Sequence, residues 1–114
     1  MIVQRIEHNR RRLRAQVNVC QTFWERGRGL LGRRLADDGQ ALLIRRCNAV
    51  HTIGMRQRID VVFCAADGRI LRIVPSLQPF RVALCAEATD TWEWRAGAAE
   101  RLCLQPGDRL NTCC

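Results

Sequence analysis

A β-hairpin pattern near the middle of the chain constrains the fold more than any other feature of the sequence. Two apolar stretches, residues 59–65 and 69–74, flank the tripeptide Ala66-Asp67-Gly68. Asp-Gly is a favoured loop dipeptide of tight hairpins, because glycine readily adopts the left-handed backbone that such turns require. The pattern therefore predicts two antiparallel strands joined by a short turn, in a chain built around a β-sheet.

Further short strands are predicted on both sides of this hairpin. Alternation of apolar and polar residues, or a short apolar run, predicts strands over residues 13–19, 41–44, 81–86, 91–95 and 109–111. Short helices are expected over 22–31 and 97–102, and turns at 37–39 and 105–108. This arrangement predicts a mainly β (β-rich α+β) fold, a compact small barrel or sandwich of short antiparallel strands with one or two short helices.

The predicted strand 91–95 carries two large aromatic residues and one acid. Trp92 and Trp94 share a face and are expected in the core, because each buries a large apolar area. Glu93 points to the opposite face, where pairing with an arginine across the sheet is expected.

The chain is long enough for one small domain. Its 114 residues are close to the common domain size. We expect residues 1–12 to form a basic arm or an edge strand, 13–111 a single β-rich domain and 112–114 a tail. The first residues lack the apolar core of a signal peptide, and no stretch approaches the roughly 20 apolar residues of a spanning helix. A cytoplasmic protein without a membrane span is expected.

The seven cysteines do not form a recognisable metal or disulfide framework. They include no CxxC pair and no zinc-finger spacing. Most lie singly in apolar stretches, where cysteine usually packs as a small hydrophobe, and this favours a reducing compartment. The adjacent Cys113 and Cys114 are the expected site of oxidation.

Positive charge is concentrated in the first part of the chain. All basic residues are arginine and the net charge is +8; residues 1–46 hold 11 arginines and 4 acids. One interpretation is a solvated surface in a protein rich in arginine. The other is a surface that binds nucleic acid or another polyanion weakly through phosphate. The candidate residues for such binding are Arg10, Arg11, Arg12, Arg14, Arg33 and Arg34.

The segment from residue 47 to 63 gathers a thiol, an imidazole and a thioether. Cys47, His51 and Met55 are spaced four apart and share a face in either a strand or a helix. Such ligands suit Cu(I) or zinc, but zinc usually takes a fourth ligand and none is nearby. We therefore expect no metal and no cofactor. A metal site, or a small enzyme with a Cys47–His51 pair, remains an alternative.

Four blocks of sequence resemble a known family. They are RGLLGR (28–33), HTIGMR (51–56) leading into IDVVF (59–63) and DG (67–68), WEWRAG (92–97) and GD (107–108). In their order and spacing they are similar to the bacterial and archaeal family called domain of unknown function 192. Ile53 stands where relatives carry an aromatic residue, and Arg58 where proline is common. The resemblance implies a small β-rich domain and no established reaction, cofactor or substrate.

The residues and the resemblance together favour a small binding or accessory domain rather than an enzyme. Its partner is expected to be a protein or a small-molecule ligand, and no catalytic residue is predicted. The expected binding residues are His51, Thr52, Arg56, Asp60 and Asp108. If these residues form one binding site, His51, Arg56 and Asp60 should line one concavity.

The two carboxylates among these residues have alternative interpretations. Asp60 or Asp108 could orient His51 and raise its pKa. Alternatively, Asp60 caps a turn or pairs with Arg56, and Asp108 closes a turn.

Overall fold

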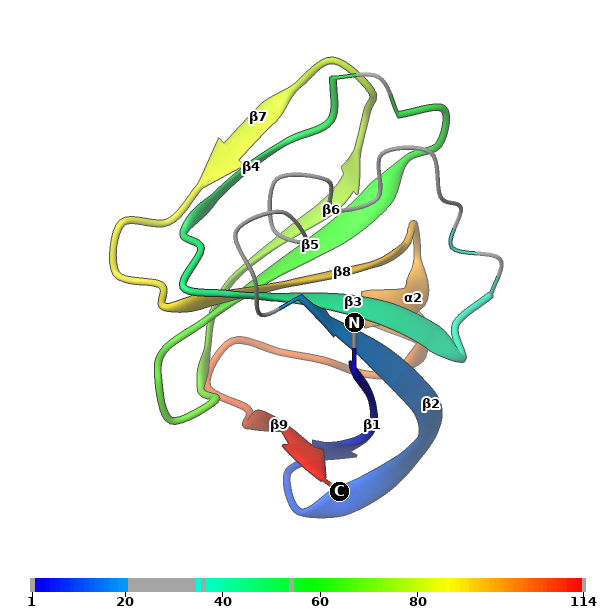
Figure 1. Cartoon of the computed structure of the whole chain (residues 1–114), viewed down its shortest axis with the longest axis vertical. Helices are drawn as coiled ribbons and strands as arrows, with labels where there is room; N and C mark the ends of the chain where they lie inside the picture. Colours follow the sequence, from blue (N-terminus) through cyan, green and yellow to red (C-terminus); the bar gives the residue numbers. More distant parts are fainter. Residues whose placement is uncertain (1, 21–34, 36, 54, 114) are drawn as a thin grey trace.

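Nine strands and one short helix make up the described part of the chain in the computed structural model (Figure 1). The structure describes residues 2–20, 35, 37–53 and 55–113. The elements are β1 (Ile2–His8), β2 (Arg11–Cys20), β3 (Gln40–Arg45), β4 (Ala49–His51), β5 (Ile59–Cys64), β6 (Ile70–Leu77), β7 (Val82–Leu84), β8 (Asp90–Arg95), α2 (Ala98–Arg101) and β9 (Leu110–Cys113).

Seven of these strands form one sheet in the order β6-β5-β8-β3-β2-β1-β9. Its neighbouring strands are antiparallel except β2 and β3, which pair in parallel. Parallel pairing of two consecutive strands requires a crossover connection between them. The other two strands, β4 and β7, form a separate antiparallel pair, here called the ribbon.

The two edges of the large sheet meet at one end. Arg69 and Arg109 form an antiparallel bridge, and the Leu110 N–H donates to the Gly68 carbonyl at 2.8 Å. Gly68 has a φ of +89°, and a Cβ there would collide with the side chain of Asn111. The sheet is therefore curled and sandwich-like, and it does not close into a barrel.

Two apolar cores lie on the two sides of the central strands. The inner core lies within the curl and includes Val17, Leu43, Val62 and the tryptophans Trp92 and Trp94, whose rings stack 5.4 Å apart. The outer core lies between the sheet and the ribbon and includes Leu42, Val61, Phe63, Val50 and Ala83. Because both cores use β3, β5 and β8, these strands carry buried residues on both faces.

The mainly β fold predicted from the sequence is confirmed. The hairpin of β5 and β6, the alternation along β8 and the helical turn of α2 all form where they were predicted. The predicted helix over 22–31 lies outside the described residues. No helix in the described ranges is long and apolar enough to span a membrane.

Two boundary predictions need correction. β1 is not an edge strand, because β9 pairs with its free side. Thr112 and Cys113 are not a tail, because they belong to β9 and pair with Ile6 and Arg5. These pairings join residues about a hundred positions apart, so local sequence patterns carry no signal for them.

Candidate functional site

The outer side of the ribbon presents apolar side chains to solvent. Val82 and Leu84 are 65% and 56% exposed and alternate with the buried Ala83. His51 lies directly opposite Val82, and Ala49 lies opposite Leu84. Residues directly opposite one another in an antiparallel pair share a face. His51 therefore lies on the exposed side of the ribbon, among apolar residues.

The two turns at one end of the ribbon extend this apolar surface. Ile53 is 55% and Phe80 65% exposed. Thr52 joins the turns from beneath: its hydroxyl donates to the Gln78 carbonyl at 2.7 Å and accepts from the Arg81 N–H at 2.8 Å. Thr52 is fully buried, so it positions the surface and does not contribute to it. We call this surface the ribbon face, made of Ala49, His51, Ile53, Phe80, Val82 and Leu84.

Arginines accompany the ribbon face. Arg72 donates to the carbonyl of Leu84 at 2.6 Å, and Arg81 donates to the carbonyl of Phe80 at 3.2 Å. Arg56 is exposed on the segment that follows Ile53. The ribbon face thus combines large apolar side chains with nearby positive charge.

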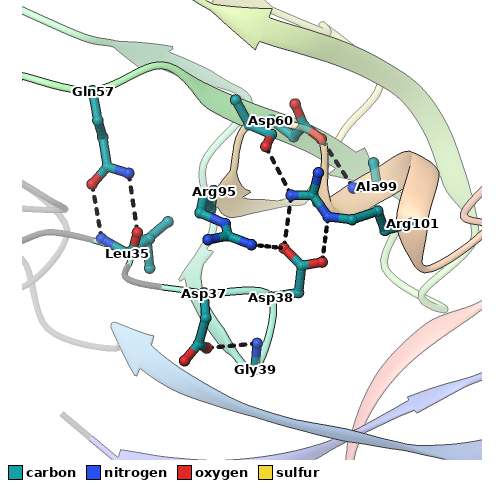
Figure 2. A network of polar contacts seen from close by, with 10 residues as sticks. Leu35, Asp37, Asp38, Gly39, Gln57, Asp60, Arg95, Ala99 and Arg101 are labelled. Atoms are coloured by element: carbon teal, nitrogen blue, oxygen red, sulfur yellow. Dashed lines mark hydrogen bonds and ion pairs between the residues drawn. The ribbon is translucent and has the colours of Figure 1, made fainter.

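Asp60 is not part of this surface. It is buried on β5, on the side of the inner core, and its two carboxylate oxygens accept from the N–H groups of Ser76 and Ala99, both at 2.9 Å. Ser76 has a left-handed φ of 48° beside an irregularity in the β5–β6 register. The Asp60 carboxylate thus holds an irregular part of β6 and the start of α2, and Figure 2 shows the contact with Ala99 of α2. The expected concavity of His51, Arg56 and Asp60 is not formed.

Asp108 pairs with the other histidine of the chain. Its carboxylate lies 2.7 Å from His8 Nε2 and accepts from the Gln105 N–H at 3.1 Å. The hydrogen bond with His8 is the main reason that the pKa of Asp108 is lowered. The expectation that Asp108 orients His51 is therefore corrected, whereas its alternative role of closing a turn is confirmed. Nothing in the local sequence marks His8 as the partner, because it lies at the end of β1.

Cys47, His51 and Met55 do not converge. The Cys47 thiol donates to the Ala49 carbonyl at 2.9 Å, and His51 Nδ1 accepts from the Ile53 N–H at 3.3 Å. Met55 is buried in the outer core. Among the described residues there is no group of three or more histidine, cysteine or acidic side chains that could hold a metal ion. The spacing of four therefore does not bring these three side chains to one point.

A polar network ties the turn before β3 to α2 and the end of β8. Figure 2 shows Asp38 accepting hydrogen bonds from Arg101 and from Arg95, the latter at 3.1 Å. The hydrogen bond from Arg101 is the main reason that the pKa of Asp38 is lowered. Arg101 also donates to the Ala96 carbonyl at 3.0 Å. Because these groups satisfy one another, the network is structural.

Glu93 is a buried acid that lacks a charged partner among the described residues. Its side chain enters the outer core, where its neighbours across the sheet are Leu42 and Val61, and it is only 3% exposed. Its Oε2 has no hydrogen-bond partner among the described residues. Burial raises its pKa to about 7. The expected pairing with an arginine across the sheet is therefore wrong.

Most of the predicted polyanion-binding residues lie together. Arg11, Arg12 and Arg14 are exposed on β2, and Arg10 is exposed in the β1–β2 turn. Arg33 and Arg34 lie outside the described residues.

A protein-family comparison places this architecture in context. The model of DUF192, described as Uncharacterized ACR, matches residues 4–112. The chain belongs to the DUF192 family. The family is uncharacterised in function, and comparison with the curated proteins gives no match.

Two crystal structures share the fold of this DUF192 chain. One is described as a "putative transcription regulator" from Sinorhizobium meliloti 1021; it is 24% identical, with a TM-score of 0.87 over 97% of this chain and 94% of that one. The other is a protein of unknown function from Novosphingobium aromaticivorans DSM 12444; it is 20% identical, with a TM-score of 0.79 over 96% of this chain and 82% of that one. Because the two sequence identities are only 24% and 20%, these matches show a shared fold and nothing more.

Several residues in the DUF192-like blocks have structural roles here. Asp60 bonds to two backbone amides, and Asp108 closes the turn before β9. Gly97 precedes α2 with a φ of +89°, and a Cβ there would displace the Arg101 guanidinium from its place. The roles of these residues therefore explain how the chain folds, and they do not indicate a reaction.

Proposed function

We propose that this DUF192 protein is a small binding or accessory module whose partner docks on the ribbon face. One observation carries the proposal. Of the five large apolar side chains that are exposed in the described part of the chain, four lie on this face: Ile53, Phe80, Val82 and Leu84. Contiguous exposed apolar surface marks interaction sites more often than single exposed residues do. His51 belongs to this surface and Arg56 lies on the adjoining segment, whereas Thr52, Asp60 and Asp108 are outside it.

The proposed occupant is an acidic segment of another protein that carries apolar side chains. Arg72 and Arg81 bond to carbonyls of the ribbon face, and Arg56 lies on the adjoining segment. Complementary charge around an apolar centre steers association and selects partners. A second copy of this chain fits less well, because the net charge of +8 would repel it.

The test uses two synthetic peptides with the same apolar residues, one acidic and one basic. Each is titrated into the isotopically labelled protein, and amide chemical shifts are followed by NMR. We expect the acidic peptide to shift the amides of β4 and β7 and to bind more tightly than the basic one. Val82→Ser should weaken binding about fivefold, equivalent to about 1 kcal/mol.

The chain offers a matched control for this substitution. Val3 is a strand valine with 58% exposure, against 65% for Val82, and it lies on β1 outside the ribbon face. Val3→Ser should leave peptide binding unchanged. The proposal fails if Val3→Ser weakens binding as much as Val82→Ser, or if the basic peptide binds equally well. Ribbon-dependent binding to anionic lipid vesicles without peptide binding would indicate a membrane surface instead.

A second candidate function is polyanion binding. The fold neighbour from Sinorhizobium meliloti is described as a "putative transcription regulator". In this chain the support is the net charge of +8 and the group of exposed arginines on β2. Positive charge of this size favours association with nucleic acid through phosphate.

We assign the protein to the cytoplasm in this proposal. Cys47, Cys64, Cys85 and Cys103 are free thiols. Thiols persist in reducing compartments and are oxidised to disulfides elsewhere, which supports the assignment.

A further inference from the structure

The arginines of the described chain differ in whether their charge is neutralised. After residue 40, four of them form ion pairs with carboxylates: Arg45 with Asp90, Arg95 and Arg101 with Asp38, and Arg109 with Asp67. In contrast, five arginine side chains near the N-terminus form no ion pair or hydrogen bond with any described residue: Arg5, Arg10, Arg11, Arg12 and Arg14. The charge of this second group is not neutralised within the described structure.

Three of these unpaired arginines share one face of the sheet. On β2, Arg12 and Arg14 alternate with Leu13 and Ala15, which pack in or against the inner core. On β1, Arg5 lies directly opposite Gln16, so it shares the outward face with them. We call this surface the β1–β2 face; it consists of Arg5, Glu7, Arg12, Arg14 and Gln16.

The turn between the two strands adds charge to the end of this face. Asn9 and Arg10 both have left-handed backbone conformations, with φ of 51° and 68°, in a two-residue hairpin loop between the paired residues His8 and Arg11. The Asn9 side chain accepts from the Arg109 N–H at 2.8 Å, which fixes the turn against the start of β9. Arg10 and Arg11 are therefore held next to the β1–β2 face by a defined backbone.

We propose that the β1–β2 face, with Arg10 and Arg11, binds the phosphate backbone of double-stranded nucleic acid. This inference rests on the second candidate function and names its surface and its ligand. Guanidinium groups bind phosphate oxygens through two hydrogen bonds, and the phosphates of a duplex are its most exposed charged groups. The binding is to phosphate and so carries no base sequence preference of its own.

The composition of the face favours a duplex over a single strand or a membrane. Single-strand binders stack bases on aromatic side chains, and none of the residues of the β1–β2 face is aromatic. Membrane surfaces also select apolar side chains that enter the lipid. Among the residues of β1 and β2 whose side chains are described, Val3 is the one large apolar residue that is exposed.

The experiment measures binding of the full chain to a short DNA duplex of arbitrary sequence by fluorescence anisotropy. Salt is varied from about 50 to 200 mM, over which phosphate binding weakens strongly. If three or four phosphates are neutralised, log K should fall against log salt with a slope of about −3 to −4. The double variant Arg12→Gln/Arg14→Gln should make that slope shallower by about 2, because each arginine removed accounts for about one unit.

Two further variants isolate the face from net charge. Arg46→Gln/Arg58→Gln removes the same charge at two exposed positions elsewhere, so it should leave the slope close to that of the native protein. Glu7→Gln removes the one acid of the face, which lies opposite Arg12, and should tighten duplex binding. The Arg46→Gln/Arg58→Gln variant makes the same chemical change as Arg12→Gln/Arg14→Gln at matched residues, and Glu7→Gln makes the opposite change in charge on the face itself.

The outcomes separate the two levels of the proposal. If the native protein does not bind the duplex at low salt, polyanion binding itself is wrong. If it binds and the two double variants lose affinity equally, polyanion binding stands and the β1–β2 face is the wrong surface. Arg12- and Arg14-dependent binding to anionic phosphatidylglycerol vesicles, with no duplex binding, would replace nucleic acid by a lipid headgroup.

Discussion

Glu93 shows at the scale of one residue that this chain tolerates an uncompensated acid in its interior. The side chain enters the outer core, beside its cross-strand neighbours Leu42 and Val61. Arg95 is on the same face of β8, and it pairs with Asp38. A buried acid without a partner favours its neutral form, because desolvation penalises charge. Glu93 should therefore make folding stability depend on pH.

The first prediction concerns Glu93→Gln. The raised pKa means that the folded chain holds this proton more tightly than the unfolded chain. The stabilisation is complete below the ordinary pKa of 4.5 and is lost as pH rises through about 7. The difference between these values corresponds to about 3 kcal/mol as an upper bound. Glu93→Gln should therefore gain stability relative to the native protein from pH 5 to about pH 8.

Urea unfolding of both proteins across this pH range provides the measurement. The difference between the two curves isolates Glu93, because other titrating groups contribute equally to each. Glu87→Gln, at an exposed position, should show little change with pH. A constant difference between Glu93→Gln and the native protein would contradict the prediction.

Asp60 acts at the scale of elements, because one side chain joins three of them. From β5, its carboxylate accepts from the N–H groups of Ser76 in β6 and Ala99 in α2, both at 2.9 Å. Buried backbone N–H groups are costly when they lack a partner. The position of α2 over the inner core and the irregular backbone of β6 therefore depend on the same carboxylate.

The second prediction is that Asp60→Asn destabilises the fold by about 2–3 kcal/mol. Asparagine has one acceptor oxygen for the two amides, and its NH₂ group would face the other N–H. Urea unfolding measures the loss, and amide hydrogen exchange should accelerate at both Ser76 and Ala99. Asp67→Asn is the control, since Asp67 accepts from the Arg69 N–H on an exposed turn and its replacement should cost much less than that of Asp60. Equal costs for the two variants would show that Asp60 does not join these elements.

At the scale of the whole molecule, the two cores depend on one another. Both are built on β3, β5 and β8, whose two faces are buried. Loss of either core would expose one side of the same strands to water. The described domain should therefore unfold as one cooperative unit.

Two buried cysteines test this third prediction without substitution. Cys64 lies in the inner core and Cys20 in the outer core. Burial raises the pKa of the Cys64 thiol to about 12, which further limits its reactivity. Pulsed thiol labelling with mass spectrometry should show both residues becoming reactive at the same urea concentration, while the exposed Cys103 reacts throughout. Earlier labelling of Cys20 than of Cys64 would indicate that the ribbon side opens as a separate unit.

Local sequence patterns determined most of the elements of this protein. The Asp-Gly hairpin, the alternation of Trp92 and Trp94 with polar residues and the short helical turn of α2 all follow from backbone preferences and side-chain period. These properties depend on residues close together in the chain, so they can be read without knowing the fold.

Tertiary structure alone decided which distant residues meet. The pairing of His8 with Asp108, the cover that β9 gives to β1 and the apolar surroundings of Glu93 all join parts far apart in sequence. The candidate surfaces have the same origin. Thr52 and Asp60 resemble His51 and Arg56 as polar residues in one short segment, but burial separates the first two from solvent. Sequence pattern predicts the face on which a side chain stands, whereas the packing of other elements on that face decides whether it can reach a partner.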